Sequence, residues 1–124
     1  MSVSLRSSDE RRLKVNAWNW GVLHELVSRA EVLPPEEWVP ARYGGGCDFD
    51  ATAVSLLAAF LEEQVLPHLR AGERMLLDGS TTDIPDDGTL HRGAELALNY
   101  SLDREVLVAV IRFLREAAGP VTIS

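Results

Sequence analysis

The longest apolar segment of the chain spans residues 50–69, and its apolar positions follow the spacing of a helix. They fall on two neighbouring stripes, which together form an apolar surface of roughly 100° or more. The first stripe is Val54, Leu57, Leu61 and Val65, and the second is Ala53, Leu56 and Phe60. A surface of this width is typical of a helix that packs in the core, so the pattern predicts a buried central helix.

Helix-start and helix-stop residues bound this segment. Asp50, or Asp48 two residues earlier, is the expected N-cap, because its carboxylate can accept hydrogen bonds from the free N–H groups of the first turn. Pro67 is expected to end the helix or to kink its last turn, since proline has no backbone N–H. The apolar run is shorter than the roughly 20 residues that cross a bilayer, so the pattern does not predict a membrane span.

Alternation and helical spacing predict the elements on either side. Val3 and Leu5 alternate with polar residues, as do Leu13 and Val15, which predicts a β-hairpin with a loop over residues 7–10. A first helix is expected over residues 17–31 with Asn16 as its N-cap. Gly21 weakens that helix by about 1 kcal/mol relative to Ala, so either packing stabilises it or Gly21 lets another part of the chain approach closely. Large aromatic residues carry much of a small core, so we expect two tryptophans of this helix in the core or at its edge, Trp18 and Trp20.

The C-terminal segment predicts a third helix over about 102–118, with Ser101 as its N-cap and acidic residues in its first turn. The run from Val106 to Ile111 also suits a strand, but its polar flanks favour a helix. Gly119 and Pro120 are expected to end the helix. A short final strand, containing Val121 and Ile123, is then expected beside the N-terminal strands.

These elements predict one helix-rich α+β domain over residues 1–124. It has three main helices, of which the central one is buried, and a small antiparallel sheet built from the terminal segments. The segment Arg74–Leu77 is a further candidate strand for that sheet. Between the first two helices, residues 33–47 are rich in Pro and Gly and predict a loop with one helical turn at 35–38.

The charge of the chain is concentrated in its middle. Residues 48–87 hold nine acidic and two basic residues, which accounts for the whole net charge of −7. Nucleic-acid binding requires a basic patch that displaces counterions from phosphates, so this distribution argues against a nucleic-acid partner. It is compatible with a basic protein partner, and also with acids that simply solvate the surface.

The single cysteine, Cys47, cannot form an internal disulfide, and the N-terminus lacks the apolar region of a secretory signal. Both observations favour a reducing, cytoplasmic location. Cys47 precedes a predicted helix N-terminus, which would lower the pKa of its thiol, but Asp48 and Asp50 oppose this, so an inert cysteine is favoured over a nucleophile.

No motif for metal, cofactor or catalytic chemistry is recognisable. His24, His68 and His91 show no metal-ligand spacing, and the glycines at 44–46 lack the pattern of a phosphate-binding loop. The acids at 78–93 do not follow the spacing of a calcium-binding loop and are better explained as solvated turn residues. We therefore expect no cofactor and no metal.

A partner surface is the remaining candidate site. Exposed aromatic residues in a loop suit protein recognition, although the same residues can also fold back onto the core. The candidate residues are two aromatics of the Pro/Gly-rich loop and three acids of the following polar loop: Trp38, Tyr43, Asp83, Asp86 and Asp87.

The tail Phe113–Arg115, followed by Gly119 and Ile123, with Trp18 near the start of the first helix, resembles a loose group of small uncharacterised bacterial proteins. These end in a helix of the form F-L-R, then two glycines, an aromatic residue and an isoleucine. Where the group has its second glycine and its aromatic residue, this chain has Pro120 and Val121. The resemblance implies a bacterial type of protein and carries no activity. Likeness to immunity proteins of toxin systems rests on size and charge alone.

Three classes of function remain compatible with the sequence. The first, which we favour, is a non-catalytic protein-binding module, such as an immunity or adaptor protein, that uses an acidic surface. The second is a structural or self-associating protein, for which a homodimer is the simplest form. The third is an enzyme or small-ligand binder with a pocket that no motif reveals.

Overall fold

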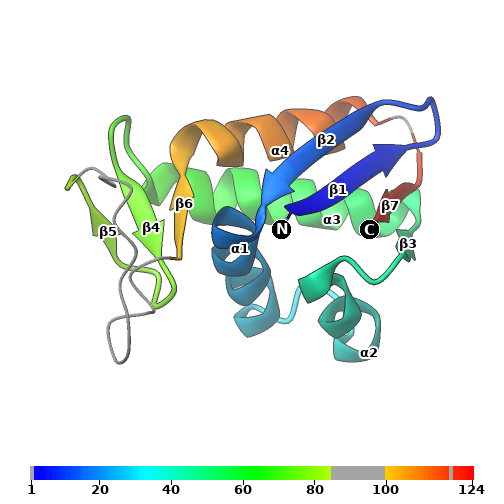
Figure 1. Ribbon diagram of the computed structural model, residues 1–124, viewed down its shortest axis with the longest axis horizontal. Coiled ribbons are helices and arrows are strands. Elements are labelled where there is room, and N and C mark those ends of the chain that lie inside the picture. Colours follow the sequence, from blue (N-terminus) through cyan, green and yellow to red (C-terminus); the bar gives the residue numbers. More distant parts are fainter. Residues whose placement is uncertain (1, 85–99, 118) are drawn as a thin grey trace.

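A computed structural model (Figure 1) describes most of the chain, namely residues 2–84, 100–117 and 119–124. The N-terminal hairpin that the sequence predicts is confirmed, since β1 (Ser2–Ser7) pairs antiparallel with β2 (Arg12–Asn16). Val3 and Leu5 of β1 are buried, as is Val15, which lies opposite Val3. The two-residue period of a strand therefore places one apolar face of the hairpin on the core.

Segments from the start, middle and end of the chain meet in one antiparallel sheet. β7 (Val121–Ile123) pairs with β1, which confirms the predicted final strand. β3 (Cys47–Phe49) pairs with the other side of β7 and completes the strand order β2-β1-β7-β3. The sequence did not predict β3, because three residues are too few to show alternation.

The first helix, α1 (Ala17–Arg29), begins directly after β2. Asn16 caps it as predicted, because its side-chain oxygen accepts a hydrogen bond from the Asn19 N–H at 2.9 Å. Trp20 is buried in the core, and Trp18 lies at the core edge with 37% of its surface exposed. The apolar residues of α1 that pack into the core are Trp20, Val22, Leu23 and Val27.

The Pro- and Gly-rich stretch after α1 holds more regular structure than the predicted loop. The expected helical turn is confirmed as α2 (Pro35–Trp38), and a 3-10 helix, η1 (Val39–Tyr43), follows it. Gly44 then adopts φ +67°, and a Cβ at this position would lie 2.6 Å from the backbone carbon of Ser124. Only glycine fits where this turn passes so close to another part of the backbone.

The central apolar segment forms three successive helical pieces: α3 (Ala51–Phe60), the π-helical turn η2 (Leu61–Val65) and the 3-10 turn η3 (Leu66–His68). Asp50 caps α3 as predicted, since its carboxylate accepts a hydrogen bond from the Ala53 N–H at 2.8 Å. Pro67, which has no N–H to donate, lies in the last turn. It explains why the regular α-helical pattern breaks before this point.

The central helix buries one of its two predicted apolar stripes. The buried stripe is Val54, Leu57, Leu61 and Val65. On the second stripe Ala53 and Phe60 are half-buried, and Leu56 leaves 49% of its surface exposed. The helix therefore packs against the core on one side and presents apolar surface on the other.

The strand predicted near Arg74 is confirmed as β4 (Arg74–Leu76), but it does not join the terminal sheet. It forms a separate antiparallel sheet in the order β5-β4-β6, with β5 (Thr81–Thr82) and β6 (Ser101–Asp103) (Figure 1). The prediction that Ser101 caps the last helix is wrong, because Ser101 pairs with Leu76 in β6.

The last helix, α4 (Arg104–Glu116), follows β6 and runs beside α3 (Figure 1). The helical interpretation of this segment is confirmed over the strand alternative. Its buried residues are Leu107, Val110, Ile111, Phe113 and Leu114. The described residues thus form a small α+β fold, and none of their helices is long and apolar enough to cross a membrane.

Candidate functional site

The structure places the predicted site residues on different parts of the fold. Tyr43 ends η1 and leaves 71% of its surface exposed, whereas Asp83 is an exposed residue after β5 in the second sheet. Asp86 and Asp87 lie outside the described residues. Trp38 is only 2% exposed, so it belongs to the core and cannot contribute to a partner surface.

Trp38 is held in the core by reciprocal hydrogen bonds with His24. The indole N–H of Trp38 donates to the His24 carbonyl at 3.1 Å, and Nε2 of His24 donates to the Trp38 carbonyl at 2.8 Å. The two rings stack with centroids 4.7 Å apart. Trp20 adds a third bond, from its indole N–H to the Ala41 carbonyl at 2.9 Å. These bonds fix α2 and η1 against α1.

Burial lowers the pKa of the His24 imidazole below its ordinary value of 6.5. The hydrogen bond to the Trp38 carbonyl opposes this effect, and the positive charge of Arg42 lowers the pKa further. His24 is therefore a neutral core residue that positions the α2–η1 segment, and it is not available as a ligand or base.

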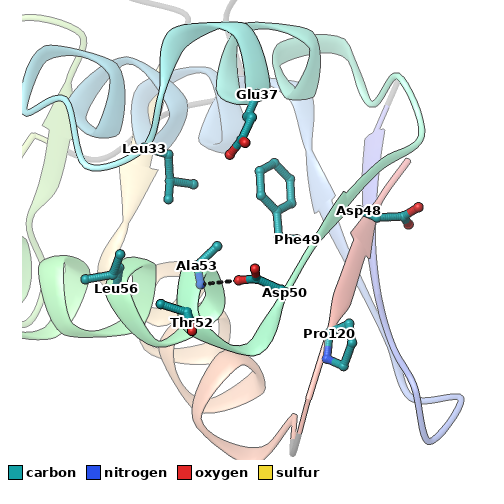
Figure 2. Close-up of a pocket in the computed structure, with 9 residues that line it drawn as sticks. All are labelled: Leu33, Glu37, Asp48, Phe49, Asp50, Thr52, Ala53, Leu56 and Pro120. Atoms are coloured by element: carbon teal, nitrogen blue, oxygen red, sulfur yellow. Dashed lines mark hydrogen bonds between the residues drawn. The ribbon is translucent and has the colours of Figure 1, made fainter.

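A groove of about 490 Å³ lies where α2, β3 and α3 meet (Figure 2). Its lining comes from the segment before α2, from α2 itself, from β3, from the first two turns of α3 and from the residue before β7: Leu33, Glu37, Asp48, Phe49, Asp50, Thr52, Ala53, Leu56 and Pro120. The groove thus collects residues that are far apart in the sequence.

The floor of the groove is apolar. Leu33 and Phe49 are buried beneath it, and Ala53 and Leu56 of α3 add the partly exposed second stripe of the central helix. Figure 2 shows Glu37 reaching from α2 toward Phe49. An apolar side chain of a ligand could therefore pack on these apolar residues, with the Glu37 carboxylate beside it.

Three carboxylates surround this floor, those of Glu37, Asp48 and Asp50. Asp48 points away from the opening at its outer rim (Figure 2) and accepts a hydrogen bond from the Thr122 hydroxyl at 2.7 Å. Asp50 caps α3. None of the three forms an ion pair with another described residue. The charges of Glu37 and Asp50 therefore lie beside the floor, whereas that of Asp48 lies on the outer rim and faces away from it (Figure 2).

The groove lining combines carboxylates with apolar side chains. Within the described part of the chain, no cluster of His, Cys, Asp or Glu side chains is suited to hold a metal ion. Cys47 is half-buried in β3, and His68 is exposed in η3, where it is not part of the groove lining. An acidic rim around an apolar floor can recognise a segment that combines positive charge with an apolar side chain.

The sequence analysis missed this groove because its residues have no common spacing. Asp48 and Asp50 were identified as helix caps and as acids near Cys47, and Glu37 was not singled out. The one available signal was the width of the apolar surface on the central helix, which exceeds what the core covers.

Comparison of the chain with protein-family models, curated proteins and solved structures found no match.

Proposed function

We propose that this chain is a non-catalytic protein-binding module, immunity- or adaptor-like in type, whose groove binds a basic segment of a partner protein. The observation that supports this proposal is the apolar floor beside Glu37 and Asp50, two carboxylates that have no ion-pair partner among the described residues. A free half-buried cysteine fits a reducing, cytoplasmic setting, which we include in the proposal.

The two parts of the groove have different roles in this proposal. Exposed ion pairs contribute only about 0–1 kcal/mol each, so most of the affinity comes from covering Leu56 and the floor. The carboxylates steer a cationic partner toward the groove and select against an acidic one. Binding should accordingly weaken at high salt, because exposed charges are screened over about 8–10 Å at physiological ionic strength.

A capture experiment with matched charge variants tests the proposal. The immobilised wild-type protein is compared with Glu37→Gln/Asp50→Asn, which removes two charges beside the floor of the groove and keeps the capping oxygen of residue 50. The control is Glu63→Gln/Glu105→Gln, which removes two exposed charges from η2 and α4. Proteins retained from a lysate at low and at high salt are identified by mass spectrometry.

We expect a basic protein that the wild type and the control retain at low salt and that the groove variant loses. Retention of the same proteins by all three chains would contradict the proposal. A separate Asp83→Asn variant tests the acidic segment that the sequence analysis favoured. Loss of the partner from this variant alone would show that the partner binds the segment around Asp83 and not the groove.

A second copy of this chain is the competing occupant, because the exposed stripe of α3 could also be covered by self-association. Sedimentation equilibrium of the wild type and of Leu56→Ser separates the two possibilities. A monomer at all concentrations leaves the groove open for another protein, whereas a dimer that Leu56→Ser dissociates would assign the groove to the homodimer.

A further inference from the structure

Four side chains from three separate segments form a ladder on the surface beside α1, in the order Trp18, Tyr100, Arg42 and Tyr43. The Trp18 and Tyr100 rings meet edge to face with centroids 4.8 Å apart. The guanidinium carbon of Arg42 lies 5.6 Å from the centre of the Tyr100 ring and 5.2 Å from that of Tyr43. Both distances are within the range of cation–π attraction.

Gly21 of α1 makes room for this ladder. A Cβ at position 21 would lie 2.8 Å from the Tyr100 ring and 3.0 Å from Nη2 of Arg42. These contacts are closer than side-chain carbon atoms tolerate, so the ladder packs directly on the backbone of α1. Glycine has a low helix propensity, but a larger residue at position 21 would collide with Tyr100 of the ladder.

The Arg42 guanidinium lies near two aromatic rings, and its Nη2 faces the α1 backbone at Gly21. Within the described residues, no ion pair or hydrogen bond satisfies its N–H groups. A cation–π contact does not use the N–H groups, so those that do not face Gly21 can still donate hydrogen bonds to a ligand. A fixed, half-buried guanidinium of this kind is prepared for a bidentate contact with a carboxylate.

The ladder and the η1 helix that carries Arg42 expose aromatic and aliphatic side chains. Tyr43 leaves 71% of its surface uncovered, Val39 of η1 leaves 60%, and Trp18 leaves 37%. A carboxylate bound to Arg42 would therefore have aromatic and aliphatic surface beside it. Such a site suits an anion that carries an aromatic ring better than a small hydrated anion, because the ring gains contacts that the small anion cannot make.

We infer that the ladder is a second binding site, independent of the acidic groove, that takes a carboxylate carried beside an aromatic ring. This chemistry is shared by a free aromatic acid and by the C-terminal aromatic residue of a peptide. In either case the carboxylate accepts hydrogen bonds from the edge of Arg42, and the ring packs on Tyr43 or Trp18.

Nuclear magnetic resonance of the Arg42 Nε–Hε group tests this inference in the whole chain. The probes are N-acetylphenylalanine, its uncharged amide, and acetate, which has the charge but no ring. We expect N-acetylphenylalanine to shift the Arg42 signal in a saturable manner and to bind at least about tenfold more tightly than the amide or acetate, which corresponds to the loss of one strong contact.

A pentapeptide that ends in phenylalanine, with a free or an amidated C-terminus, identifies the source of the carboxylate. Binding of both the free acid and the free-ended peptide indicates a chain end as the ligand. Binding of N-acetylphenylalanine without binding of the free-ended peptide indicates a small-molecule ligand. Either of these two results supports the site.

Variants separate binding from a purely structural role of the ladder. Arg42→Gln should weaken binding of N-acetylphenylalanine by about tenfold or more, followed through the amide signals of the neighbouring residues. Tyr43→Ser, at an exposed position, should weaken it without affecting the fold. Arg29→Gln, which removes an exposed arginine of α1, serves as the control and should bind as the wild type does. Equal shifts by the acid and the amide, or wild-type affinity in both ladder variants, would overturn the inference.

Discussion

Individual polar residues of this chain are placed where each satisfies a specific backbone group. His24 and Trp38 bond to each other's carbonyls, and Asn16 and Asp50 each cap a helix. Buried polar groups cost free energy unless they are paired. No buried side-chain polar atom among the described residues lacks a hydrogen-bond partner, so single substitutions at these positions should have measurable effects.

The first prediction concerns pH and His24. The unfolded chain protonates this histidine near its ordinary pKa of 6.5, whereas burial lowers the pKa in the folded protein. Between these two pKa values the unfolded state binds more protons, so the free energy of unfolding should fall as the pH decreases below about 6.5. The contribution of neutral His24 to the free energy of unfolding is complete above about pH 6.5. It is lost as the pH falls from there through the pKa of His24 in the folded protein.

Urea unfolding of the wild type, of His24→Gln and of His68→Gln at about pH 7.5 and pH 5.5 checks this prediction, in a range where histidines titrate and most carboxylates do not. The His24 variant should lose most of the difference between the two pH values. The exposed His68 serves as the control and should keep it. An unchanged difference in His24→Gln would show that another group is responsible.

Gly21→Ala is a second prediction at the residue scale. Helix propensity alone would stabilise the protein by about 1 kcal/mol. The added methyl group meets the Tyr100 ring and Arg42, and overpacking of this kind costs roughly 1–3 kcal/mol. We expect a net loss in the free energy of unfolding. Gly119→Ala, whose Cβ makes only an ordinary contact of 3.4 Å with Ser8, should be close to neutral. A stabilised Gly21→Ala would contradict the packing of the ladder.

At the scale of elements, the cap of α3 has both a structural and an electrostatic role. Asp50→Ala should destabilise the protein by about 1 kcal/mol, because the Ala53 N–H loses its acceptor. Asp50→Asn keeps a capping oxygen and removes only the charge, so it should retain nearly wild-type stability and weaken only partner binding. Thermal or urea unfolding of both variants measures this, and equal losses in the two would show that charge, not capping, dominates.

Elements with strong local patterns could be predicted from the sequence. Helices α1, α3 and α4, the N-terminal hairpin and the caps at Asn16 and Asp50 follow from periodicity and from side chains that can accept from free N–H groups. β3 and β6 could not be predicted, because each has three residues and exists through pairing with a distant segment. The sequence could not predict that β4 lies in a separate sheet for the same reason, because the residues of a short strand do not indicate which strand it pairs with.

For the molecule as a whole, neither net charge nor single residues could locate the candidate groove. The acidic middle of the chain contains Asp48 and Asp50 but not Glu37, and the sequence could not show that these three residues line one groove. It also suggested Trp38 as a surface residue. Whether a tryptophan in a short helix faces inward depends on partners such as His24, which come from another element.

The most direct test of the proposed function is a titration of the isotope-labelled protein with two synthetic helical peptides. Both have the same apolar face of leucines, and their polar face is lysine in one and glutamate in the other. The proposal predicts saturable, salt-sensitive shifts of the amide signals of Leu33, Phe49, Ala53 and Leu56 with the lysine peptide and none with the glutamate peptide. Equal shifts with both peptides, or shifts with the lysine peptide that lie away from these residues, would contradict it.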